Sequence, residues 1–277
     1  MASHNTIKKA LLEKNFKKVD YLLEMVSPVE HADYPLLCEL IYYNQVDLFK
    51  KALKKGWSIQ TVDNLGHYPI HLAVLRGNLE CVDLLVNAGA NLNQSKENKT
   101  HATTSYTISS AFHVFPLHNI SELESKYWYK MIEKLMSLGA HIHIKDECDC
   151  NILHLLSLKL EHFHNPEDIQ EMKKVVQFCI ENGLDINDQD YLGDTILIQL
   201  TSTEEAFSII DLLIDNGADI YRFNRLGNTA QDYLSMSGLN SDLIWKNWEK
   251  RSDAFFEKKN LNQCLPEASK FKKEKRI

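Results

Sequence analysis

The stretch that decides the fold is Asp63-Asn-Leu-Gly-His-Tyr-Pro-Ile-His-Leu-Ala73, followed by Gly77-Asn-Leu-Glu-Cys-Val-Asp-Leu-Leu85 and Gly89-Ala-Asn-Leu-Asn93. The Asp-x-x-Gly segment predicts a turn, and Val82, Leu84 and Leu85 have the spacing of an apolar helix face. Gly77 and Gly89 each stand at the expected end of a helix, where the chain would leave the helix in a left-handed conformation. The stretch therefore predicts a turn followed by two short helices.

This stretch resembles the ankyrin repeat, whose pattern combines D-x-x-G-x-T-P-L-H-x-A, a glycine between two helices, V-x-x-L-L and a closing G-A. Tyr68 stands where the pattern has Thr, whereas Pro69, Ile70, His71 and Ala73 keep their places. The resemblance implies an all-α ankyrin-repeat solenoid of helix-turn-helix units, each with a β-hairpin finger between units.

The pattern recurs along the chain with a period close to that of the family. Gly56 lies 33 residues before Gly89, and Asn44 lies 33 residues before Gly77. Further helix endings stand at Gly139, Gly183 and Gly217, and helix entries at Gly193 and Gly227. We expect about seven units over residues 6–250, within a repeat domain that spans residues 1–250.

Neighbouring units must stack, because two short helices cannot bury their apolar stripes alone. The two end units then need a polar outer face. Charged and polar residues fit an N-terminal and a C-terminal cap, namely Lys8, Lys9, Glu13, Lys14, Lys17 and Lys18, and Lys246, Asn247, Glu249, Lys250 and Arg251. Residues 251–277 are expected to form a polar, basic tail that is partly disordered.

Two spacings are longer than the period and predict insertions near residues 94–125 and 159–168. In the first, Tyr106–Ala111 aligns with Tyr68–Ala73, which divides the extra residues between a longer finger and the helix-helix turn. An alternative register places the helix entry at Pro116-Leu-His118. Insertions in repeat proteins map to loops and commonly enlarge a binding face, but lengthening a loop also costs little free energy.

Composition and charge exclude several classes of protein. The chain has 277 residues, of which 44% are hydrophobic and 25% charged, and no apolar run is long enough to span a bilayer. The N-terminus has no basic segment followed by an apolar core, so we expect no secretory signal. The net charge is −7, with −12 on residues 1–245, which disfavours nucleic-acid binding. Six cysteines without a regular framework fit a reduced, cytoplasmic protein.

The most tempting chemical cluster is His141, His143, Cys148, Cys150 and His154. Thiolates and imidazoles are ligands for Zn²⁺, but Cys-x-Cys is tighter than the usual spacing of paired ligands, and His154 matches a structural histidine of the family. The sequence contains no phosphate-binding glycine motif and no activated nucleophile. We therefore expect no enzyme activity, no cofactor and no metal, and keep a metal-dependent or enzymatic protein using this cluster as the alternative.

What remains is recognition of a protein. The resemblance implies a concave surface of fingers and inner helices, and interface energy concentrates in aromatic residues and arginine. Eight candidate partner-binding residues stand at finger positions, namely Trp57, Asn64, His67, Tyr191, Tyr221, Arg222, Phe223 and Arg225. Acidic residues also follow successive fingers, at Asp146, Glu147, Asp149, Asp188 and Asp190, and favour a basic partner. A second interpretation is that Asp188 and Asp190 only shape turns.

The sequence is thus interpreted as a non-enzymatic protein-interaction module with a protein partner, expected to be monomeric and without a membrane span. A structural subunit of a permanent assembly is a further class, which would appear as an obligate oligomer. By analogy, a chain with no other domain is similar to ankyrin proteins of intracellular bacteria or viruses that act in host cells. That analogy predicts a host-directed effector with a translocation signal in residues 254–277.

Overall fold

The structure, a computed structural model, describes residues 3–95, 116–159, 166–201, 204–236 and 241–258. These residues are mainly helical, and the β pairing among them is a single bridge between Phe223 and Thr229. Their contacts divide the chain into two units, which are described separately: Met1–Leu123 with Lys130–His141, and Glu124–Tyr129 with Ile142–Ile277. None of the described helices has the length and apolar character needed to cross a bilayer.

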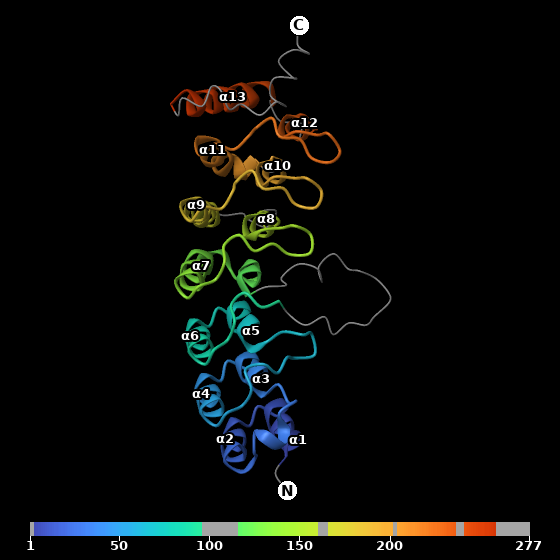
Figure 1. Cartoon of the computed structure of the whole chain (residues 1–277), viewed down its shortest axis with the longest axis vertical. Helices are drawn as coiled ribbons and strands as arrows, with labels where there is room; N and C mark the ends of the chain where they lie inside the picture. Colours follow the sequence, from blue (N-terminus) through green and yellow to red (C-terminus); the bar gives the residue numbers. More distant parts are fainter. Residues whose placement is uncertain (1–2, 96–115, 160–165, 202–203, 237–240, 259–277) are drawn as a thin grey trace. The chain divides into compact units, whose positions relative to one another are not determined.

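The first unit is built from short helices that alternate along the chain between two rows. They are α1 (His4–Leu12), α2 (Phe16–Met25), η1 (Val29–His31), α3 (Leu36–Tyr42), α4 (Val46–Lys54), α5 (Pro69–Leu75), α6 (Leu79–Asn87), η3 (Pro116–Glu122) and most of α7 (Trp128–Ser137). Helices α1 and α2, α3 and α4, and α5 and α6 pack as pairs (Figure 1). The pairs are stacked on one another: α3 contacts α5, α2 contacts α4, and α4 contacts α6.

The apolar stripes predicted from the sequence form the interior of these stacks. Val82 and Leu85 of α6 are fully buried, as are Phe49 and Ala52 of α4. Successive second helices are also joined on the surface by ion pairs, including Lys51 with Asp20 at 2.6 Å and Lys50 with Glu80 at 2.6 Å. Such exposed pairs add little stability, so burial of the stripes accounts for the stacking.

The turn inside each helix pair has one conformation but not one residue type. Gly77 has a φ of 66°, and the equivalent residues of the two preceding pairs, Asn44 and Lys14, have φ values of 53° and 52°. The left-handed turn is therefore kept even where the residue is not glycine, at a cost that asparagine tolerates better than lysine. Asn15 and Asn78 then cap the second helices by accepting hydrogen bonds from the N–H groups of Lys18 and Cys81.

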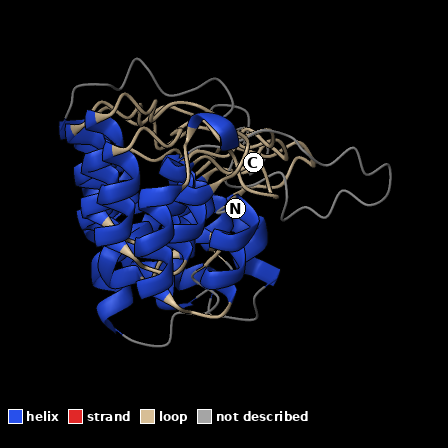
Figure 2. Ribbon diagram, turned by 90° about the horizontal axis from the view of Figure 1, so that it is seen from below, coloured by secondary structure: helices blue, strands red, loops and turns tan. Residues whose placement is uncertain are grey.

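The second unit repeats the arrangement. Its elements are η4 (Ser125–Tyr127), α8 (Ile152–Ser157), α9 (Pro166–Glu181), α10 (Ile196–Leu200), η6 (Glu204–Ala206), α11 (Phe207–Asp215), α12 (Ala230–Met236) and α13 (Ser241–Lys258). Helix α10 packs between α8 and α12, and α11 packs between α9 and α13. Within each unit, the long loops that follow the second helices extend to one side of the helices (Figure 2).

The first insertion adopts the alternative register. The position beside α5 belongs to η3, whose residues Leu117, His118 and Ile120 are buried at 0–1% exposure. Pro116 thus begins the element that packs as the next first helix, although it is a 3₁₀ helix. The first register places the entry at Tyr106, and residues 106–111 lie outside the described residues.

The second insertion and the predicted tail both continue into helix. Residues 160–165 lie outside the described part, and α9 begins at Pro166 and has 16 residues, compared with 9 in α11 and 18 in α13. The predicted boundary at residue 250 falls inside α13, which buries Trp245, Trp248 and Ser252 and extends to Lys258. Residues 259–277 lie outside the described part.

Both ends carry the expected polar surface. All six of the residues predicted for the N-terminal cap are exposed, from Lys8 to Lys18. In α13, Lys246, Asn247 and Lys250 are exposed, and Arg251 forms ion pairs with Asp211 and Asp215 of α11 at 3.2 and 2.7 Å.

Candidate partner-binding loops

Four of the long loops share one local geometry, centred on an aspartate or asparagine. In the loop of residues 190–194, Asp190 Oδ1 accepts hydrogen bonds from the N–H groups of Leu192 and Asp194 at 2.8 and 2.9 Å. The backbone N–H of Asp190 also donates to the carbonyl of Asp194 at 3.0 Å. The same bonds recur in the loops 63–67, 146–150 and 224–228. These residues build the turns themselves, which confirms the turn-shaping interpretation for Asp190.

Asp188 has a different role. Its Oδ1 forms an ion pair with Lys145 at 2.8 Å, and its Oδ2 accepts a bond from the side chain of Asn151 at 3.5 Å. It therefore ties two successive loops together instead of shaping its own turn.

The expected β-hairpin form of the fingers is not confirmed. Each of the four loops closes with one backbone bond between its first and fifth residues, and the described residues contain no β-strand. The fourth residue of each loop has a positive φ: glycine at 66, 193 and 227, and Asp149 with a φ of 56°.

Backbone hydrogen bonds connect the three loops of the second unit. The N–H of Tyr191 donates to the carbonyl of Cys148 at 2.8 Å, and the N–H of Arg225 donates to the carbonyl of Leu192 at 2.9 Å. The side chain of Gln189 adds bonds to the carbonyls of Gly193 and Phe223 at 2.5 and 3.0 Å. Because backbone atoms join the loops, their side chains are held at fixed spacing.

Four of the predicted partner-binding residues are exposed on these connected loops. Tyr191 and Phe223 are each 55% exposed, and Arg222 and Arg225 are also exposed. The guanidinium of Arg225 lies 5.3 Å from the centre of the Tyr191 ring, a cation–π contact that brings together residues 34 positions apart.

Two of the predicted residues belong to the packing instead. Trp57 is only 3% exposed and makes an edge-to-face contact with Tyr34, so its side chain is part of the packing and not of the exposed loop surface. Tyr221 is half-buried: its ring packs edge-to-face on Trp245, and its hydroxyl donates to Glu249 at 3.3 Å. Each aromatic ring contacts a residue distant in sequence, which local patterns do not reveal.

Asn64 and His67 lie in the loop 63–67 of the first unit. Asn64 is exposed, whereas His67 is half-buried, with its Nδ1 3.2 Å from Asp63 Oδ2. Burial of Asp63 raises its pKa, but hydrogen bonds from the side chain and backbone of His67 outweigh burial, and the pKa of Asp63 falls below its ordinary value. His67 thus stabilises its own loop.

The histidines and cysteines of the alternative hypothesis do not form a metal site. Among the described residues, no group of three or more His, Cys, Asp or Glu side chains is arranged to hold a metal ion. His154 uses both ring nitrogens in the fold, since Nδ1 accepts from the N–H of Asn151 and Nε2 donates to the carbonyl of Asp194 at 3.2 Å. Burial raises the pKa of both Cys148 and Cys150, as do nearby carboxylates, which disfavours the thiolate that a metal requires.

Two further thiols in the described part of the chain fit the expectation of inert core residues. Cys81 and Cys179 are fully buried, and burial raises the pKa of each to about 12.

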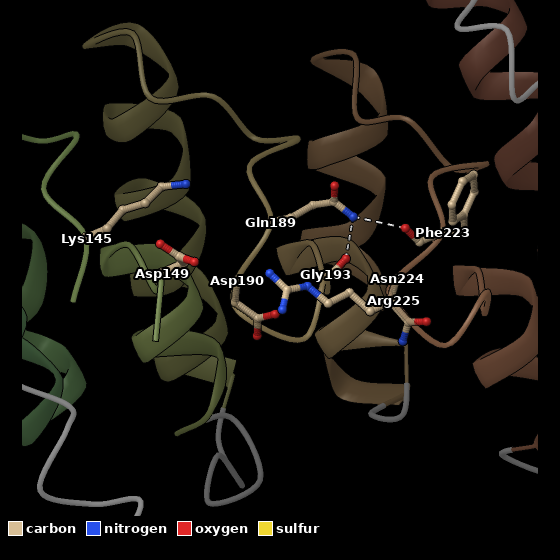
Figure 3. A pocket seen from close by; sticks show the side chains of 8 residues that line it. All are labelled: Lys145, Asp149, Gln189, Asp190, Gly193, Phe223, Asn224 and Arg225. Atoms are coloured by element: carbon tan, nitrogen blue, oxygen red, sulfur yellow. Dashed lines mark hydrogen bonds between the residues drawn. The ribbon is translucent and has the colours of Figure 1, made fainter. Parts of the chain in front are cut away.

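A shallow groove of about 410 Å³ crosses the three loops of the second unit (Figure 3). Its lining residues are Lys145 and Asp149 from the first loop, Gln189, Asp190 and Gly193 from the second, and Phe223, Asn224 and Arg225 from the third. The groove contains two of the predicted binding residues, Phe223 and Arg225, and the polar side chains of Gln189, Asp190 and Asn224, which are buried or half-buried and hydrogen-bonded.

Sequence reasoning missed the apolar residues at the loop tips. Leu65, Leu192 and Leu226 occupy the third position of their loops and are 67%, 53% and 79% exposed. The signal was present in the sequence, because each leucine stands between an Asp or Asn and a glycine in a turn, where no helix face or strand can bury it.

Comparison with known proteins agrees with this architecture. A family model described as "Ankyrin repeats (many copies)" matches residues 37–86. The potassium channel AKT2/3 of Arabidopsis thaliana is 24% identical over 64% of this chain and 18% of its own length. The putative ankyrin repeat protein L371 of Acanthamoeba polyphaga mimivirus is 25% identical over 69% of this chain and 22% of its own length. Ankyrin repeat and SOCS box protein 3 of Homo sapiens is 41% identical over 18% of this chain and 10% of its own length. The chain therefore spans about a fifth or less of the length of these relatives.

Proposed function

Because the chain is an ankyrin-repeat protein, we propose that it is a protein-interaction module that binds a protein partner through the loops of its second unit. Proteins of this family are generally interaction modules and generally not enzymes. The observation that carries the proposal is the pairing of exposed Tyr191 with exposed Arg225, next to Phe223, on loops that backbone hydrogen bonds hold together. Aromatic residues and arginine on a preorganised surface are the usual centre of a protein interface.

The fold supports this function in a second way. Within the five-residue segments 146–150, 190–194 and 224–228, Cys150 is the one residue of the buried hydrophobic core, so the exposed residues of these segments can contact a partner without loss of packing. We also propose, from the resemblance, that the repeats form one continuous solenoid. Small-angle X-ray scattering of the full chain would test it, and a scattering curve of a compact globule would contradict it.

Affinity capture with surface variants tests the binding proposal. The tagged full chain is compared with a variant carrying Tyr191→Ala, Arg222→Ala and Arg225→Ala, and captured proteins are quantified by mass spectrometry. We expect at least one protein to be captured by the intact chain and reduced about tenfold or more by the variant, because these residues carry the interface.

The matched control changes three exposed residues on helices, Lys54→Ala, Lys246→Ala and Asn247→Ala. Capture should be unchanged in this control. Equal capture by the intact chain and the loop variant, with both folded by circular dichroism, would place the binding surface elsewhere.

Location is a separate proposal. We propose that the protein acts in the cytoplasm, either that of its own cell or that of a host cell into which it is delivered, and the similarity to a mimivirus ankyrin protein is what supports the host-directed case. A reporter fused to the chain with and without residues 254–277 tests delivery. Entry that depends on those residues supports the proposal, and equal entry without them removes the predicted signal.

A further inference from the structure

The three connected loops of the second unit differ in charge. The loop from Lys145 to Cys150 carries one lysine and three carboxylates, and residues 188–194 carry three carboxylates and no basic residue. The third loop reverses this balance, since residues 222–228 carry two arginines and no carboxylate. A molecule lying across the loops therefore passes from an acidic region to a basic one.

The two ends of the groove each present an exposed charge. Asp149 is exposed, and no basic side chain in the described part of the chain forms an ion pair with it. At the other end, Arg225 is exposed and contacts the Tyr191 ring, and no described carboxylate pairs with it. Lys145, by contrast, is already paired with Asp188 at 2.8 Å, so it does not cancel the charge of Asp149.

The carboxylates of the acidic region also raise the pKa of a neighbouring thiol. Burial raises the pKa of the Cys148 thiol, and the carboxylates of Asp146, Glu147, Asp190 and Asp149 raise it further. These carboxylates lie on two successive loops, so the region acts on a ligand as one patch instead of as separate charges.

The groove floor between the two charges is rigid. Gly193 lies there, and a side-chain carbon added to it would stand 2.7 Å from the backbone nitrogen of Arg225. The amide of Gln189 is fixed by its two bonds to backbone carbonyls, and Asp190 by its bonds to Leu192, Asp194 and Gln199. The backbone positions of Asp149 and Arg225 are therefore connected through hydrogen bonds between three successive loops.

We propose that this groove binds an extended segment of a partner protein that carries a basic side chain facing Asp149 and an acidic side chain facing Arg225. The inference rests on the proposed function and deepens it by naming the partner's chemistry and its direction along the groove. Charge complementarity at two fixed points selects one orientation, because the reversed segment would place like charges together at both ends.

Peptide selection on the immobilised full-length protein tests the proposal. Random linear peptides displayed on phage are enriched, and the wild type should select one basic and one acidic position at a constant separation. A synthetic consensus peptide then binds wild type, Arg225→Glu and the control Lys54→Glu, which makes the same charge change at an exposed position of α4. We expect about tenfold or more weaker binding to Arg225→Glu and unchanged binding to Lys54→Glu.

One charge exchange and one charge removal complete the test. A peptide whose acidic residue is replaced by lysine should recover binding to Arg225→Glu. Asp149→Asn removes the other charge while keeping a residue type that tolerates a positive φ, so the variant should no longer prefer the peptide's basic residue over glutamine. Circular dichroism and the thermal midpoint verify that each variant is folded.

The outcomes separate this inference from the proposed function. A consensus without the two charges, equal binding of the consensus peptide to Arg225→Glu and wild type, or no recovery by the exchanged peptide would each overturn the inference. Partner capture that is still lost in the variant of Tyr191, Arg222 and Arg225 would then leave the proposed function standing. If the peptide experiments give one of these outcomes and the loop variant also captures partners as well as the intact chain does, both the inference and the proposed function are overturned.

Discussion

At the scale of single residues, two glycines with the same backbone conformation have different surroundings. Gly193 and Gly227 both have a φ of 80°, but an added Cβ at Gly193 would meet the backbone of Asn224 and Arg225. At Gly227 such an atom would meet nothing within 4 Å. The first glycine is required by its φ and by the next loop, and the second by its φ alone.

Gly193→Ala should therefore destabilise the protein by about 2–3 kcal/mol, because the backbone bond from Arg225 to Leu192 must shift as well. The matched change Gly227→Ala should cost only about 1 kcal/mol. Urea unfolding followed by circular dichroism measures both. Equal costs would mean that the close approach of the two loops is absent in solution.

A second residue-scale prediction concerns Asp146. Its Oδ1 accepts two backbone bonds, but Oδ2 is buried and has no hydrogen-bond partner among the described residues. Burial raises the pKa of Asp146, and Asp149 and Glu147 raise it further, while the bonds from Cys150 and Cys148 lower it. The folded protein thus holds this proton more tightly than the unfolded chain does.

The contribution of Asp146 to the unfolding free energy should consequently fall as pH rises from the ordinary aspartate pKa of about 4 through the raised value. Asp146→Asn lacks this titration but keeps the turn, as Asn224 does in the loop 224–228. The variant's stability relative to wild type should increase across that pH range. A difference between the two proteins that does not change with pH would contradict the prediction.

At the scale of elements, α13 belongs to the core of the second unit. Trp248 is 1% exposed and contacts Phe207 of α11 edge-to-face, with ring centres 5.5 Å apart. Trp248→Ala should cost about 3–5 kcal/mol, because a large buried side chain is removed. The control Lys246→Ala, on the exposed face of the same helix, should change stability by less than about 0.5 kcal/mol. A small effect of Trp248→Ala on the urea midpoint would show that α13 is peripheral.

The elements also show where sequence reasoning succeeds. The helix pairs and their left-handed turns follow from Gly77, Asn44 and the apolar spacing, because these are local properties of the chain. The register of the first insertion and the length of α13 did not follow. Both depend on which segment packs best against α5 or α11, and several segments have a suitable local pattern.

At the scale of the whole molecule, stability in repeat proteins is the sum of units and their nearest-neighbour contacts. A core mutation should therefore act most strongly in its own unit. We expect Phe49→Ala to speed amide hydrogen exchange in α2, α4 and α6 more than in α9 and α11, and Trp248→Ala to do the reverse. Mass spectrometry in mild urea measures both patterns. A uniform increase throughout the chain would show a single cooperative unit instead.

The amino-acid sequence alone determined the helical repeats and their turns. These features depend on bonds within a few residues, such as those from Asp190 to Leu192 and Asp194. Only the tertiary structure decided which of the predicted finger residues are exposed. Trp57 packs against Tyr34 and Tyr221 packs against Trp245, whereas Arg225 and Tyr191 contact each other and are both exposed. The exposure of a side chain depends on neighbours in space, which a local sequence pattern does not specify.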